Sequence, residues 1–87
     1  MEPTAQARYA AQVRWAVGVM DDRFTPESAA DKVLEMVDDE PQFFDGMPGV
    51  DRLARLVDAA RREGDDGPSR AALREFLIEL SGRLERG

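Results

Sequence analysis

Apolar residues recur along the chain at helical spacing, and this pattern holds nearly from end to end. It predicts four helices, at approximately residues 4–20, 25–39, 50–63 and 69–85. We therefore expect an all-α protein in which residues 1–87 form a single compact, four-helix bundle-like domain. A chain of 87 residues lies near the lower end of what folds around its own hydrophobic core.

The first predicted helix is apolar on two sides. One row includes Tyr9, Val13 and Met20, and a second row on another side includes Trp15 and Val19. A helix of this kind is usually central in a bundle or contributes one side to an oligomer. Since so short a chain offers little to cover a second side, Trp15 and Val19 form a possible oligomer face.

Residues with strong positional preferences mark the ends of the other helices. Thr25 is the predicted N-cap of the second helix, with Pro26 at its first position, and Pro41 ends it. Gly64 ends the third helix, and Ser69 is the predicted N-cap of the last. The short turn between these two helices makes them antiparallel neighbours.

The last three helices each carry an apolar stripe that predicts the core. The last stripe is the cleanest, and Ile78 lies off it, so we expect Ile78 to be exposed. The inward positions are Ala29, Ala30, Val33, Leu34 and Val37, then Val50, Leu53, Leu56, Val57 and Ala60, and finally Leu73, Phe76, Leu77, Leu80 and Leu84.

The connection over residues 40–49 is long for a link between helices, which commonly takes about 2–8 residues. Two prolines and two glycines give it a defined shape, and its apolar side chains are Phe43, Phe44 and Met47. These side chains either fill one open end of the bundle core or bind a partner. Both can hold if one ring points inward and the other outward.

The charge imbalance is confined to one segment. Residues 21–51 contain ten acidic and two basic residues, a sum of −8, while the flanking parts each sum to +1, which gives −6. Such a composition argues against binding to nucleic acid or to anionic membranes. It suits a basic protein partner, and it also simply favours solubility. Asp38, Asp39 and Glu40 lie at the negative end of a helix dipole, which is a local conflict.

Residue types that carry chemistry are scarce. The chain has no cysteine and no histidine, so zinc and copper lose their usual ligands and no serine has a histidine base beside it. Asp38, Asp39 and Asp45 could hold a hard cation, but their spacing does not match a calcium loop. We expect no catalytic residues, no metal and no cofactor.

A nucleic-acid site is also not favoured. Arg52, Arg55 and Arg62 align on one side of the third helix, where they can pair with nearby acids or with solvent. The connection before this helix is too long for the turn of a helix-turn-helix motif. We therefore expect no nucleic-acid partner.

The composition also bears on where the protein works. No run approaches the ~18 apolar residues of a membrane span, and the N-terminus lacks the basic and apolar regions of a signal peptide. We therefore expect no membrane partner and a cytoplasmic location. Eleven arginines against one lysine, with many alanines, are typical of a GC-rich bacterial genome.

One fragment resembles a known class of domains. Residues 56–63, read Leu-Val-Asp-Ala-Ala-Arg-Arg-Glu, are followed by a turn and a leucine-bearing helix. This region is similar to the tail of bacterial effector-associated, death-like adaptor domains. The resemblance covers about a third of the chain, rests on generic helical residues, and does not reach the first two helices. It would imply a homotypic adaptor in a defence or signalling system.

The sequence thus favours a non-enzymatic protein-binding module: a small acidic adaptor or inhibitor, resembling bacterial immunity proteins, that engages a basic partner. The predicted interface is Asp38, Asp39, Glu40, Phe43, Phe44, Asp45 and Met47. A self-associating structural or death-like adaptor domain is the alternative, and an accessory subunit of an enzyme is the third possibility.

Overall fold

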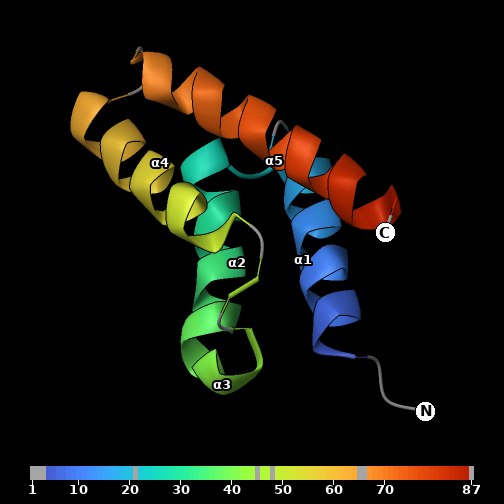
Figure 1. The fold of residues 1–87 in the computed structure, drawn as a ribbon. Coiled ribbons are helices and arrows are strands. Elements are labelled where there is room, and N and C mark those ends of the chain that lie inside the picture. The colour runs from blue at the N-terminus through green and yellow to red at the C-terminus, as the bar shows by residue number, and fades with distance from the viewer. Residues whose placement is uncertain (1–3, 21, 45, 48, 65–66, 87) are drawn as a thin grey trace.

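Two antiparallel helix pairs and one short helix build the fold (Figure 1). The computed structural model describes residues 4–20, 22–44, 46–47, 49–64 and 67–86, and these residues contain helices and no strand. The helices are α1 (Ala5–Val19), α2 (Pro26–Asp39), α3 (Pro41–Phe44), α4 (Val50–Glu63) and α5 (Pro68–Arg86). The predicted all-α, bundle-like fold is therefore confirmed, and α3 is an addition within the predicted 40–49 connection.

Local capping accounts for several helix ends. The Thr25 hydroxyl oxygen accepts a hydrogen bond from the Ser28 N–H at 3.2 Å, and Pro26 is the first residue of α2, as predicted. Thr4 caps α1 in the same way, through the Ala7 N–H at 3.1 Å. Gly64 ends α4 with a φ of 85°, a conformation that only glycine adopts readily.

Ser69 is not the N-cap of the last helix, so that prediction is wrong. Helix α5 already begins at Pro68, and Ser69 lies inside its first turn. The Ser69 N–H donates to a Glu63 carboxylate oxygen at 3.0 Å, and its hydroxyl donates to the other oxygen. These hydrogen bonds lower the pKa of Glu63. The last residue of α4 therefore caps the helix that follows, with a negative charge at the positive end of α5.

The two helix pairs cross with the core between them. Helices α1 and α2 pack side by side, α4 and α5 form the second pair, and α5 lies across the end of α1 (Figure 1). Gly49 lets α5 come close to the start of α4, because a Cβ atom there would lie 2.9 Å from the Phe76 ring. The largest fully buried side chains are Tyr9, Phe44, Leu53, Leu73, Leu77, Leu80, Val13 and Val33.

Most of the predicted inward positions are buried. Leu34, Val50, Leu56, Phe76 and Leu84 are only partly covered and pack at the edge of the core. Ile78 is 46% exposed, so the prediction that it lies off the stripe is confirmed. None of the helices in the described ranges is long and apolar enough to cross a membrane.

Ion pairs tie α2 to the second helix pair. The Arg70 guanidinium of α5 donates two hydrogen bonds to the Glu27 carboxylate, at 2.9 and 2.6 Å. The side chains are only 26% and 12% exposed, so solvent screens this pair little. Arg61 of α4 forms an ion pair with Asp31, one turn further along α2. Arg61 of α4 and Arg70 of α5 thus offset part of the acidic charge in residues 21–51.

The Glu27–Arg70 pair makes stability depend on pH. The hydrogen bond from Arg70 is the main cause that lowers the pKa of Glu27 below its ordinary value of 4.5. A carboxyl group with a lower pKa in the folded state stabilises the fold fully above its unfolded pKa. That contribution is lost as the pH falls through the lower, folded pKa.

We expect Glu27→Gln to lower the free energy of unfolding by about 1–3 kcal/mol at neutral pH, because a charge-assisted bidentate pair is lost. Urea unfolding followed by circular dichroism at neutral pH and at about pH 3 measures this, and the gap between variant and wild type narrows at the lower pH. Glu35→Gln is the matched control, since the Lys32–Glu35 pair is exposed and its loss costs about 0.5 kcal/mol or less. An equal gap at both pH values would contradict the assignment.

Candidate functional site

The end of α2 turns sharply into α3 and creates a projecting corner. Pro41 has no N–H to continue the hydrogen bonding of α2, and Glu40 adopts a non-helical conformation, with φ −136° and ψ 60°. The Phe43 N–H donates to the Glu40 carbonyl at 3.0 Å and closes the new turn. This corner lies at the end of the molecule remote from α5 (Figure 1). We call its exposed side chains the α2–α3 corner: Asp38, Asp39, Pro41, Gln42 and Phe43.

The two adjacent phenylalanines have opposite environments. Successive residues of a helix point about 100° apart, so one ring of a neighbouring pair can face the core while the other faces water. Phe44 is fully buried, and Phe43 is 52% exposed. The predicted interface included both rings, but Phe44 is a core residue and offers no surface to a partner.

Arg8 of α1 fastens α3 to the rest of the fold. Its guanidinium lies 5.5 Å from the centroid of the Phe44 ring, and its Nη2 is 2.9 Å from Oε2 of Glu40. The first contact is a cation–π interaction and the second an ion pair. Because Arg8 holds both residues at once, the Phe43 ring is carried on an anchored turn.

The three acids at the end of α2 differ in whether they form an ion pair. Asp38 and Asp39 are exposed and form no ion pair with any residue that the structure describes. The charge of Glu40 is offset by Arg8. Asp38 and Asp39 therefore have no basic partner among the described residues at the end of α2, and the exposed Phe43 follows them by four to five residues in the chain.

Two further residues of the predicted interface are Met47 and Asp45. Met47 is partly buried and packs against the core. Asp45 lies outside the described residues. A cavity of about 170 Å³, lined by Val37, Pro41, Phe44 and Met47 among others, lies beside α3. It is smaller than the ~300–1,000 Å³ typical of small-molecule sites.

The predicted oligomer face is also partly covered. Trp15 is 39% exposed, and its ring lies 5.5 Å, centroid to centroid, from the ring of Phe24. Val19 is half-buried against the core. The sequence prediction did not include Phe24, because the residue precedes a helix start and belongs to no apolar stripe.

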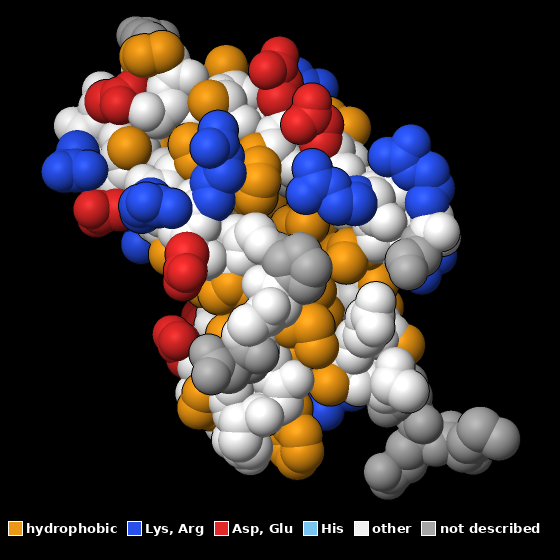
Figure 2. All heavy atoms as spheres, viewed as in Figure 1, with side chains coloured by type: hydrophobic (Ala, Val, Ile, Leu, Met, Phe, Trp, Pro, Cys, Tyr) orange, Lys and Arg blue, Asp and Glu red, His pale blue; other side chains and the backbone are white. Residues whose placement is uncertain are grey.

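The aligned arginines of α4 have separate contacts. Arg52 lies over the Phe76 ring at 5.6 Å, and Arg62 lies 3.5 Å from Asp58 in its own helix. Figure 2 shows that basic side chains spread across α4 and α5, with acidic and apolar side chains among them. In the described part of the chain, no group of three or more His, Cys, Asp or Glu side chains is placed to hold a metal ion.

The chain matches no protein-family model, no curated protein and no solved structure in the three comparisons. The similarity of residues 56–63 and the following helix to effector-associated domains accordingly remains a resemblance.

Truncating the two phenylalanines should separate their roles. Phe44→Leu is expected to lower the free energy of unfolding by about 1–1.5 kcal/mol, and Phe44→Ala by about 3–5 kcal/mol, enough to unfold much of so small a domain. Phe43→Ser should change it by about 1 kcal/mol or less, because half of that ring is already in water. Urea unfolding gives both values, and equal losses for Phe43→Ser and Phe44→Leu would contradict the assignment of Phe44 to the core.

Proposed function

We propose that this chain is a non-enzymatic protein-binding module whose α2–α3 corner engages a basic surface of another protein. The observation that carries the proposal is that Phe43, Asp38 and Asp39 are all exposed where α2 turns into α3. An adaptor and an inhibitor would both use such a surface. We further propose that it acts in the bacterial cytoplasm.

Each part of the corner has a separate task in this proposal. Asp38 and Asp39 present negative charge that attracts a basic surface over a Debye length and speeds encounter. Phe43 then supplies the apolar anchor, because aromatic side chains carry much of the binding energy when water is excluded around them. The anchored α3 holds the ring in place before binding, so little conformational entropy is lost on association.

Charge elsewhere on the chain supports the choice of this end of the molecule. Glu27, Asp31 and Glu40 are each paired with an arginine of another helix, so their charges are offset locally. Asp38 and Asp39 contribute to the net charge of −6 without an ion-pair partner among the described residues. A basic partner approaching the corner meets two exposed acids, Asp38 and Asp39, that form no ion pair with any described residue.

The test begins with affinity capture. Wild type and Phe43→Ser are immobilised, and lysate of the source cells is applied after separation into acidic and basic fractions. We expect a protein from the basic fraction to be retained by wild type and lost with Phe43→Ser, while Ile78→Ser, which truncates an exposed apolar side chain elsewhere, retains it. Capture of the same protein by Phe43→Ser would contradict the role of the ring.

The purified captured protein then allows the acids to be tested by association kinetics. Asp38→Asn/Asp39→Asn should lower the association rate constant about tenfold at low salt, with little change in the dissociation rate constant. Asp58→Asn/Glu79→Gln removes the same charge from α4 and α5 and serves as the matched control. An association rate that is insensitive to salt, or equal in the two double variants, would exclude steering by the corner.

A further inference from the structure

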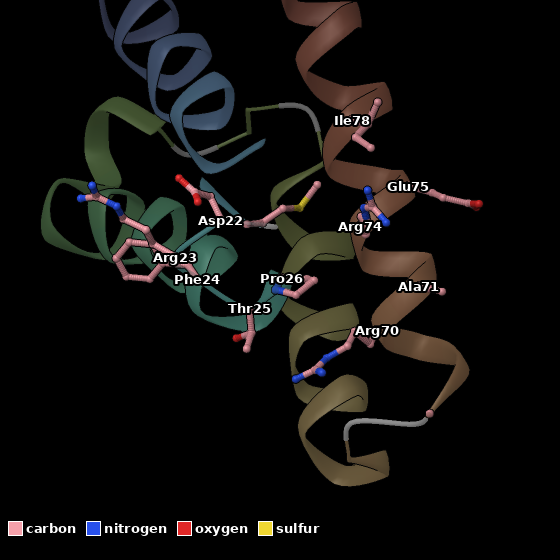
Figure 3. Close-up of a pocket in the computed structure, with 12 residues that line it drawn as sticks. Asp22, Arg23, Phe24, Thr25, Pro26, Arg70, Ala71, Arg74, Glu75 and Ile78 are labelled. Atoms are coloured by element: carbon pink, nitrogen blue, oxygen red, sulfur yellow. The ribbon is translucent and has the colours of Figure 1, made fainter. Parts of the chain in front are cut away.

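A second surface of the molecule is a groove between the α1–α2 turn and α5. It has a volume of about 780 Å³. Figure 3 shows Asp22, Arg23 and Phe24 of the turn on one side, and Arg74, Glu75 and Ile78 of α5 on the other. Its lining includes the buried side chains of Met20 and Pro26.

Apolar exposure is concentrated around this groove. Among the described residues, three large apolar side chains are exposed, and two of them, Trp15 and Ile78, belong to this region. Phe24 links them, because it lines the groove with Ile78 and its ring contacts Trp15. A single exposed apolar side chain is ordinary on a protein surface, whereas a cluster beside a groove is typical of an interface.

The groove also has a fixed frame. The Glu27–Arg70 pair joins α2 to α5 beside it, with Arg70 itself among the lining residues. Arg14 of α1 lies 3.8 Å from Glu85 near the other end of α5. The elements on its two sides are thus joined to each other, so binding there needs little rearrangement.

The charged residues of the groove favour a second copy of the chain as its occupant. Among the lining residues, Asp22 and Arg23 lie on the turn, and Arg70, Arg74 and Glu75 lie on α5. Arg70 is paired with Glu27, so the other four leave two acids and two bases. In a two-fold arrangement, the turn of one copy faces α5 of the other, and acids can meet bases on both sides. Two copies that each carry −6 repel each other, so they associate most readily through a face of balanced charge.

We propose that this groove, with the Trp15–Phe24 ring pair at its edge, is the contact surface for a second copy of the chain. The Phe24 and Ile78 side chains of each copy would pack in the shared apolar centre, with the charged pairs at the rim. The surface is separate from the α2–α3 corner, and the proposal does not depend on the proposed function.

Trp15 provides a direct readout because it is the single tryptophan of the chain. Light scattering and tryptophan emission are recorded from about 1 µM to 1 mM protein. We expect the mass to rise from 9.7 kDa toward twice that value, with a parallel blue shift of the emission as Trp15 leaves water. A mass of one protomer throughout, with unchanged emission, would overturn the proposal.

Two variants locate the contact. Ile78→Glu places a charge in the apolar centre and should raise the dissociation constant at least about tenfold, while circular dichroism remains that of wild type. Phe43→Ser, which removes the exposed ring of the other surface, should associate as wild type does. Wild-type association by Ile78→Glu, or loss of association in Phe43→Ser, would overturn the assignment to the groove.

Salt distinguishes the two proposals. Added salt should strengthen self-association, because it screens the repulsion between copies and the exposed rim pairs contribute little. The same salt should slow the encounter of the α2–α3 corner with a basic partner. Self-association that weakens in salt would show that attraction across the groove exceeds the repulsion between the copies, and would overturn the argument that repulsion directs two copies to this face.

Discussion

The bidentate ion pair between Glu27 and Arg70 is the interaction on which the arrangement of the helices depends. It joins the first turn of α2 to α5, across the place where the two helix pairs cross. The apolar core holds the helices together, and this two-point bond between partly buried groups adds a specific position for α2 along α5. Asp31 and Arg61 make a similar link between α2 and α4.

The same pairing changes the meaning of the acidic segment. As a sequence it is a block of negative charge, but in the fold its central acids stabilise contacts between helices. Only some of the acids, including Asp38 and Asp39, keep an unpaired negative charge among the described residues. The charge available to a partner is therefore smaller and more localised than the composition indicates.

The sequence predicted the long helices well because their ends are determined locally. Thr25, Pro26 and Gly64 act through residues within one turn, and periodicity alone identifies the inward positions. Helix α3 was not predicted because a four-residue turn has too few residues to show a period. Its position depends on the burial of Phe44 and on Arg8, which is distant in the sequence.

The candidate surfaces were predicted only in part. Adjacent rings gave no indication of which one would be buried, and Phe44 was included in an interface that it cannot join. The Glu27–Arg70 pair joins residues 43 positions apart, so no local pattern could show it. Phe24 and Ile78 lie far apart in the chain and line the same groove only because of the way the helices cross.

The difference in burial between Phe43 and Phe44 has a consequence for how this protein can evolve. Phe44 is fixed by the core, so few substitutions there would be tolerated. Phe43 lies on the same short turn but is half in solvent, and many side chains could replace it without loss of the fold. A lineage can therefore change the surface that this turn presents one residue at a time, while the buried ring keeps the turn in place.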